Sequence, residues 1–115
     1  MKTAFGWIEI GDHWYDHDII IHTDGSVSKR KKKLSKPMKA GFGHTPLSLE
    51  ELAIVKEEKP EIIYIGTGQY GDLPLTREAE TFLESFHSVL GPTPDILPEI
   101  EREQKKYFAI LHVSC

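Results

Sequence analysis

The sequence predicts an α/β domain with a central mixed, partly parallel sheet and an N-terminal antiparallel β-meander. Two observations carry most of this prediction. Residues 61–65 and 107–113 are almost continuously apolar, as strands covered on both faces are. Helix-like segments separate the strands in the last two-thirds of the chain, and this alternation favours parallel pairing. The length of 115 residues suits a single domain over residues 1–115.

The first third of the chain reads as short antiparallel strands. We predict a first strand over residues 5–10 and a turn of the chain over residues 11–18. Residues 18–22 form a compact β-branched strand. Asp24-Gly25 then marks a tight turn, because Asp-Gly is a strong hairpin signal. Residues 27–31 would be the returning strand.

The middle of the chain predicts a loop followed by a helix. The loop covers residues 34–45, which contain a proline and two glycines. Ser48 is placed to cap the helix, with Glu51 three residues later as in a capping box. Pro60 ends the helix. The side chains predicted to face inward are those of Leu49, Leu52, Ala53 and the stem of Lys56.

The remaining elements follow from caps and apolar periodicity. Thr76 can cap a helix, whose apolar stripe consists of Ala79, Phe82, Leu83 and Phe86. Residues 86–91 fit either the end of that helix or a short strand. We favour a strand over residues 87–91, because Thr93-Pro94 is a good start for a last helix over residues 94–105.

The charge of the chain is unevenly distributed. The net charge is −4, yet residues 29–39 hold seven of the 14 basic residues and no acid. Such a block can contact phosphate or an acidic protein. It can also keep a strand edge from pairing with another chain. We favour the second interpretation and do not expect nucleic-acid binding, since no aromatic residue for base stacking is interleaved with the lysines.

The composition bears on the location of the protein. No apolar run approaches the length of about 18 residues that a membrane span needs, and the N-terminal apolar run is too short for a signal peptide. Cys115 is the single cysteine, so an internal disulfide cannot form. We therefore expect a cytoplasmic protein without membrane association. The absence of asparagine, with abundant Glu and Lys, is typical of thermophilic proteins.

The stretch IIYIGTGQYG, residues 62–71, resembles a strand that runs into a dinucleotide-binding G-x-G-x-x-G turn. In such a turn the helix begins within the motif, whereas here Pro74 prevents this and Thr76 is the next credible cap. We therefore expect neither NAD nor FAD, and no other cofactor. The loop still lies at the usual ligand edge of an α/β sheet. The candidate residues for a small anion or polar ligand are Gly66, Thr67, Gly68, Gln69, Tyr70 and, nearby, His44.

The histidines, the cysteine and the serines give weaker evidence for a metal site or a catalytic site. His13, His17 and His22 lie among aspartates, but His17 and His22 would point to opposite faces of an extended segment. We therefore predict no metal site. His112 is expected to be a buried, hydrogen-bonded group and Cys115 a passive end. The spacing of serines, histidines and aspartates indicates no nucleophilic triad, so no catalytic residue is assigned.

Several short motifs occur in the same order along nearly the whole chain as in a known family. They are GWIEIG from Gly6, the Tyr15–Asp18 segment, Asp24-Gly25, His44, the strand from Ile62 into Gly66-Thr67-Gly68, Thr93-Pro94, and the ending His112-Val113-Ser114-Cys115. On these motifs the chain resembles the small α/β family typified by an archaeal protein of unknown function. The eukaryotic relatives in that family include a mitochondrial complex I assembly factor and an adipogenesis-associated protein.

This resemblance implies a three-layer α/β domain with a central mixed sheet and no established catalytic activity. The mitochondrial relatives look like assembly or partner-binding proteins. Relatives tend to carry Ala and then Tyr-Asn after Thr93-Pro94, where this chain has Asp95 to Glu99, and its block over residues 29–39 is more basic. The resemblance leaves the identity of the partner open.

The sequence therefore predicts a non-catalytic module that binds a protein partner, with the oligomeric state open. The alternative is a small-molecule or anion binder, or an unrecognised enzyme, that uses the Gly-Thr-Gly loop. A concave site with convergent polar groups at the edge of that loop would favour the alternative. A flat apolar patch near Trp7, Trp14 or Phe42 would favour the partner-binding module.

Overall fold

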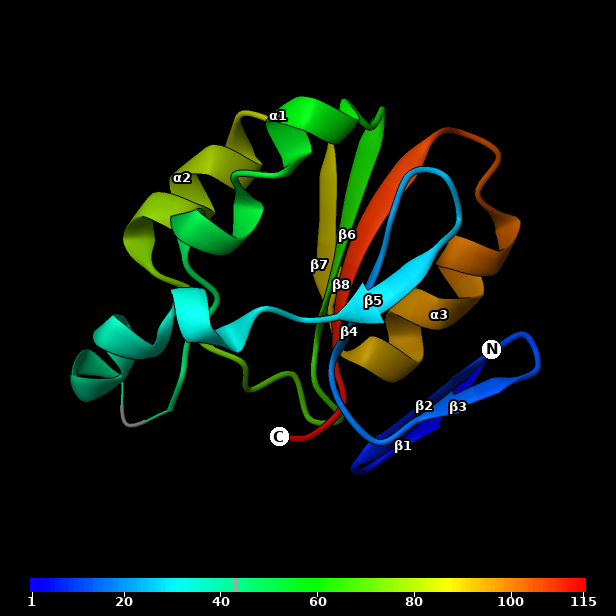
Figure 1. Cartoon of the computed structure of the whole chain (residues 1–115), viewed down its shortest axis with the longest axis horizontal. Helices are drawn as coiled ribbons and strands as arrows, with labels where there is room; N and C mark the ends of the chain where they lie inside the picture. The colour runs from blue at the N-terminus through cyan, green and yellow to red at the C-terminus, as the bar shows by residue number, and fades with distance from the viewer. Residues whose placement is uncertain (43) are drawn as a thin grey trace.

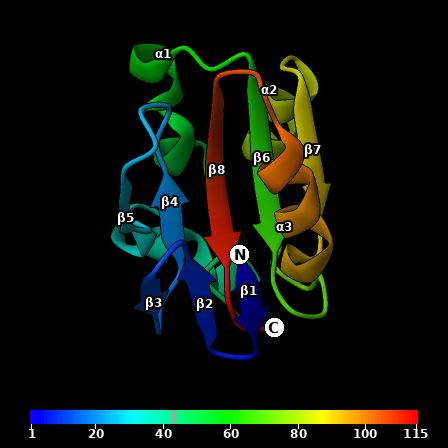
Figure 2. The same cartoon turned by 90° about the vertical axis from the view of Figure 1, so that its right-hand side faces the viewer.

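A five-stranded mixed sheet forms the centre of the molecule. The structure is a computed structural model that describes residues 1–42 and 44–115. In spatial order the strands are β5 (Val27–Lys29), β4 (Ile19–Ile21), β8 (Tyr107–His112), β6 (Ile62–Thr67) and β7 (Ser88–Gly91) (Figure 2). Strand β4 is antiparallel to β5 and β8, whereas β6 is parallel to β7 and β8. This arrangement confirms the predicted mixed sheet.

The N-terminal meander forms a separate small sheet of three antiparallel strands. These are β1 (Lys2–Ala4), β2 (Trp7–Ile10) and β3 (His13–Tyr15). The prediction of a turn over residues 11–18 was wrong for His13–Tyr15, which pairs with β2. The reason is that Gly6 and Gly11 have positive φ angles of 90° and 60°, and glycine alone adopts them without strain. The predicted strand over residues 5–10 corresponds to β2, which begins at Trp7 after the turn at Gly6, and the turn at Gly11 then leads into β3.

Helices cover both faces of the central sheet (Figure 1). On one face lie α2 (Arg77–Glu84), α1 (Val55–Glu58) and the 3₁₀ helix η3 (Leu49–Leu52); on the other lie α3 (Thr93–Arg102) and the small sheet. The molecule therefore has three layers. Thr76 caps α2 as predicted, because its hydroxyl accepts a hydrogen bond from the Ala79 N–H at 3.2 Å. The short strand predicted over residues 87–91 is confirmed as β7.

The segment between β5 and β6 departs most from the prediction. The predicted loop over residues 34–45 contains the 3₁₀ helix η2 (Lys36–Gly41), and a second 3₁₀ helix, η1 (Lys32–Leu34), ends at its first residue. Gly43 lies outside the described residues. The helix expected after Ser48 begins as η3. The side chains that it buries are those of Glu51, Leu52 and Val55; those of Leu49, Ala53 and Lys56 are exposed. The inward face is therefore rotated from the predicted one, and the contacts of Glu51, described below, explain why.

Strands β6 and β8 are buried side by side, as their apolar sequences predicted. Their side chains alternate between two hydrophobic clusters. Ile63, Ile65, Phe108 and Ile110 pack toward α2, and Ile62, Tyr64, Ala109 and Leu111 pack toward α3. Both faces therefore require apolar residues. In the described part of the chain, no helix is long and apolar enough to cross a membrane.

We predict that Ile110→Ala lowers the free energy of unfolding by about 2–5 kcal/mol, because it removes three carbons from a fully buried site. Leu90→Ala is the matched control: it also removes three carbons, but Leu90 is 45% exposed. Urea denaturation of both variants checks the prediction. Equal midpoints for the two variants would contradict the assignment of β8 to the core.

Candidate functional site

The Gly-Thr-Gly loop lies at the carboxyl end of β6, at the edge of the central sheet, as predicted. The next α-helix begins only at Arg77, so the loop is not a dinucleotide-binding turn. Gly68 has a φ of 102°, which confirms the expected positive φ. A Cβ at Gly68 would lie 2.3 Å from the Ser114 carbonyl oxygen, and one at Gly66 would lie 2.6 Å from the Thr93 hydroxyl. The glycines are therefore needed for close packing.

The backbone amides of the loop hold the end of the chain. Gln69 N–H donates to the Ser114 carbonyl at 3.0 Å, and Tyr70 N–H donates to the Cys115 backbone oxygen at 3.1 Å. Gly68 N–H donates to the Thr93 hydroxyl at 3.1 Å. These are amides to which an anion was predicted to bind. Binding of an anion there stays a prediction, and it would require the last residues to move.

His44 does not join this loop in the structure. Its side chain is exposed, and among the residues that the structure describes it has no hydrogen bond to the loop. The loop instead contacts the N-terminal hairpin. Gln69 Nε2 donates to the Thr3 hydroxyl at 2.9 Å, and the rings of Phe5 and Tyr70 lie 6.2 Å apart.

A buried network of charged side chains lies at the same edge of the sheet, and sequence analysis did not find it. At its centre is Arg30, whose side chain is fully buried. Its Nη1 donates to Asp18 Oδ2 at 2.8 Å, and its Nε and Nη2 donate to the two carboxylate oxygens of Glu51 at 2.8 and 2.9 Å. Nη2 also donates to the Pro46 carbonyl at 3.1 Å. A buried guanidinium that bridges two carboxylates in this way is strongly held.

Two serines complete the network around Glu51. The Ser35 hydroxyl donates to Glu51 Oε2 and lies 2.6 Å from the Ser48 hydroxyl. Ser48 therefore pairs with Ser35 instead of capping η3, which corrects the predicted capping box. Within residues 1–42 and 44–115, every buried side-chain nitrogen and oxygen has a hydrogen-bond partner, as a stable buried polar network requires.

Asp18 links this network to the end of β8. Its Oδ2 accepts a hydrogen bond from His112 Nδ1 at 2.7 Å, and its Oδ1 accepts one from the Val113 N–H at 2.9 Å. Burial by itself raises the pKa of Asp18. The interaction with His112, together with donors from Val113 and Arg30, outweighs burial and holds this pKa well below its ordinary value of 3.8. Asp18 is therefore ionised at neutral pH.

His112 is buried and hydrogen-bonded, as predicted, but it also faces a second group. Its Nε2 lies 3.3 Å from the hydroxyl of Ser114, which is half-buried. Because ionised Asp18 can only accept hydrogen bonds, the Nδ1 of His112 carries a proton. In the neutral imidazole, Nε2 then presents a lone pair to Ser114.

A cavity of about 340 Å³ opens beside this network. Its lining residues are Gly6, Asp16, His17, Asp18, Lys29, Arg30, Lys32, Val113 and Ser114. A second concavity of about 560 Å³ shares Lys29, Arg30 and Lys32 with it and is otherwise lined by Lys31, Lys33, Leu34 and Lys36. The basic block is therefore folded around two concavities at the edge of the sheet. We name the 340 Å³ cavity the edge cavity.

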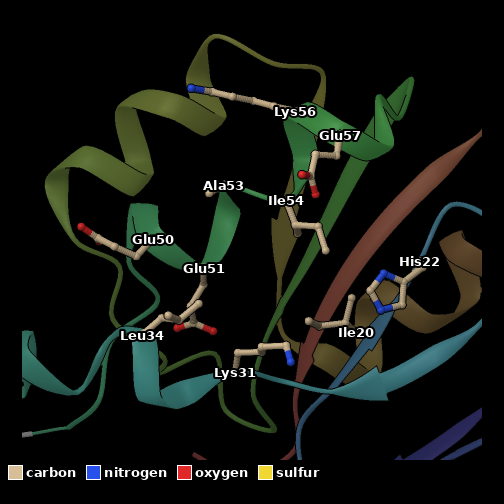
Figure 3. A pocket seen from close by; sticks show the side chains of 10 residues that line it. All are labelled: Ile20, His22, Lys31, Leu34, Glu50, Glu51, Ala53, Ile54, Lys56 and Glu57. Carbon is tan, nitrogen blue, oxygen red and sulfur yellow. The ribbon is translucent and has the colours of Figure 1, made fainter.

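A third concavity, of about 450 Å³, lies on the α1 side of the sheet (Figure 3). It is lined by Ile20, His22, Lys31, Leu34, Glu50, Glu51, Ala53, Ile54, Lys56 and Glu57. Ile20 and Ile54 give it an apolar interior (Figure 3). It differs from the edge cavity, whose lining is mainly polar and charged.

The histidines considered for a metal site make separate contacts. His17 Nδ1 donates to the Asp18 carbonyl at 3.0 Å. His22 contacts Glu58 through Nδ1 and the Ser28 hydroxyl through Nε2. Across the described residues, no group of three or more His, Cys, Asp or Glu side chains is arranged to hold a metal ion.

The fold and the site define a small three-layer α/β domain with a polar cavity at the edge of its mixed sheet. Over 100% of its length the chain is similar to the crystal structure of conserved hypothetical protein PH1505 from Pyrococcus horikoshii OT3, with 31% identity, a TM-score of 0.85 and 98% coverage of that chain. It is also similar to MT938, with 29% identity, a TM-score of 0.78 and 96% coverage of that chain. The chain belongs to the family of PH1505. Comparisons with protein-family models and with curated proteins gave no match.

We predict that the ionised form of Asp18 stabilises the fold. Because its pKa is lower in the folded than in the unfolded chain, this contribution is present above about pH 4 and is lost as the pH falls toward the folded pKa. Asp18→Asn should cost about 3–5 kcal/mol at pH 7, since it breaks a buried ion pair. It should also make stability less dependent on pH between about pH 5 and 3.

Urea denaturation at pH 7, 5, 4 and 3 checks this prediction. Asp12→Asn is the matched control, because Asp12 is exposed, and its profile should run parallel to that of the wild type. An Asp18→Asn profile that also runs parallel to the wild type would contradict the role assigned to this carboxylate.

Proposed function

We propose that the protein binds a small anionic molecule, with a carboxylate or phosphate group, in the edge cavity. The observation that carries this proposal is the charge around the cavity. The two adjoining concavities are lined by six basic residues. Three acidic residues lie near these basic residues. Asp16 and Asp18 line the edge cavity, and Glu51 accepts hydrogen bonds from Arg30. A chain with a net charge of −4 thus concentrates positive charge at one place.

Lys32 is the lysine best placed to meet such a ligand. Its side chain is 48% exposed, and its Nζ lies 3.8 Å from Asp18 Oδ2. Since Asp18 Oδ2 already accepts hydrogen bonds from Arg30 and His112, Lys32 is free to turn toward an anion. Lys29 and Ser114 line the same cavity and offer further donors. A few convergent polar groups in a concave site are typical of small-molecule sites.

We predict that inorganic phosphate or a small dicarboxylate binds with an affinity that falls as the salt concentration rises. Lys32→Gln should weaken the Kd about fivefold, or by about 1 kcal/mol, which is typical of one partly exposed charge contact. Lys105→Gln is the matched control, because Lys105 is exposed and precedes β8 at the opposite end of the sheet.

Titration by calorimetry and by amide chemical shifts at two salt concentrations checks this prediction. Shifts should centre on residues 16–18, 29–32 and 113–114. NAD(H) and FAD should give no saturable heat, because the glycine-loop amides already have acceptors. Equal phosphate affinities for the wild type and Lys32→Gln would contradict the proposed site.

A second candidate function is the non-catalytic binding of a protein partner. Exposed aromatic rings favour it: Phe5 is 60%, Trp14 58% and Tyr70 72% exposed. Large aromatic side chains are enriched in protein interfaces. The small α/β family that the sequence resembles has eukaryotic relatives that look like assembly proteins, which supports such a function. In this case the ligand of the edge cavity would be an acidic group of the partner.

Affinity capture from native extract distinguishes the two functions. If the protein is a partner-binding module, the variant Phe5→Ala/Tyr70→Ala should lose a protein that the wild type retains, whereas Leu90→Ala should retain it. If small-molecule binding is the function, this variant should bind phosphate like the wild type, and mass spectrometry should find a small anion in wild-type but not in Lys32→Gln preparations.

A further inference from the structure

We propose that Ser114, His112 and Asp18 form a nucleophilic centre that hydrolyses a small ester carrying an anionic group. Only the anionic group of the substrate rests on the proposed function. The nucleophilic centre itself rests on the hydrogen bonds among the three residues and on the position of Ser114 in the edge cavity.

The three side chains form one chain of hydrogen bonds. Ser114 Oγ lies 3.3 Å from His112 Nε2, and His112 Nδ1 lies 2.7 Å from Asp18 Oδ2. A hydroxyl, an imidazole and a buried carboxylate in this order are the arrangement by which serine hydrolases activate a nucleophile. The serine–histidine distance of 3.3 Å is at the long end of hydrogen bonding, and such catalytic pairs tighten in the transition-state complex.

The surroundings suit each of these roles. Asp18 is only 4% exposed and is fixed by Arg30 and the Val113 N–H, so it can hold the imidazole in one orientation and tautomer. His112 is 6% exposed, so its Nε2 is shielded from most of the solvent. Ser114 is half-buried and lines the edge cavity, where a substrate can reach its hydroxyl.

Strand pairing brings these residues together. Ile19 of β4 lies opposite Leu111 of β8, so Asp18 comes beside His112 although they are 94 residues apart in the sequence. Ser114 lies two residues beyond His112, and its position is fixed because its carbonyl accepts the Gln69 N–H. The close approach at Gly68 permits this contact. The glycine loop thus positions the nucleophile.

The reaction would follow the usual two steps of ester hydrolysis. Ser114 Oγ attacks the ester carbonyl carbon while its proton moves to His112 Nε2. The tetrahedral intermediate then expels the alcohol, which takes that proton, and leaves an acyl group on Ser114. Water attacks the acyl group with His112 as the base, releases the acid and restores the serine.

Two features of the cavity restrict the substrate. Its volume of about 340 Å³ admits a small acyl or alcohol group. Lys29 and Lys32 at its wall favour a substrate with a carboxylate or phosphate at the far end.

The test is covalent labelling of the full chain with an alkyl fluorophosphonate, which reacts with activated serines by loss of fluoride. Intact mass and peptide mapping should place one label on Ser114 of the wild type. Ser114→Ala should abolish the label, and Ser26→Ala, at an exposed serine, should leave it unchanged. His112→Asn should slow labelling at least about 100-fold, because asparagine keeps a donor for Asp18 but has no base at the Nε2 position.

Absence of label at Ser114 in the wild type overturns the proposal, as does a label whose rate His112→Asn leaves unchanged. Circular dichroism shows whether His112→Asn is folded. If it is not, the rates at which the wild type and Ser114→Ala hydrolyse p-nitrophenyl acetate are compared instead. A slower Ser114→Ala supports the proposal, and equal rates overturn it. Lys32→Gln should raise KM for mono-p-nitrophenyl succinate, whereas Lys105→Gln, at an exposed lysine at the opposite end of the sheet, should leave this KM unchanged.

The proposed anion site and the proposed nucleophilic centre can each be rejected without the other. Phosphate binding without labelling of Ser114 rejects the nucleophilic centre and keeps the binding site. Labelling of Ser114 without phosphate binding keeps the nucleophilic centre and rejects the anion site.

Discussion

The buried guanidinium of Arg30 is the interaction on which the arrangement of the edge of the sheet depends. It joins Asp18, just before β4, to Glu51 in η3, and Asp18 in turn holds His112 at the end of β8. A charge buried this deeply needs partners, because an unpaired ion in the interior costs several kcal/mol. The need to bring Glu51 inward therefore sets the orientation of η3, against the weaker preference of Leu49 and Ala53 for burial.

The glycine loop supports the same edge through packing. Gly66 lets the end of β6 approach Thr93 at the start of α3, and Gly68 lets it approach Ser114. The hydroxyl of Thr93 accepts from the Gly68 N–H and donates to the His112 carbonyl at 2.6 Å. The glycine motif resembles a phosphate-binding turn, but its amides are thus hydrogen-bonded within the protein, to Thr93 and to the backbone of the last residues. The hydrogen bonds of the loop fix the position of the last residues, Ser114 and Cys115.

The basic block, residues 29–39, and the buried network share Arg30. Arg30 lies inside the molecule with its acids, whereas the neighbouring lysines line the concavities around it. Protection of the edge of β5 stays a prediction for these lysines, and their position around the concavities is the observation on which the proposed anion site rests. In this member of the family of PH1505, the edge cavity is lined by basic and acidic side chains and by a serine that lies beside an imidazole.

The sequence alone determined the elements whose signals are local. The apolar runs of β6 and β8, the Thr76 cap and the Asp24-Gly25 turn depend on neighbouring residues, and the structure confirms them. Pro74 was also enough to reject a dinucleotide-binding turn. Only the tertiary structure decided the site. Arg30 and Glu51 are 21 residues apart, and Asp18 and His112 are 94 apart, and no local pattern links such residues. Their contact follows from which strands pair and in which register, and that register is set by burial across the whole sheet.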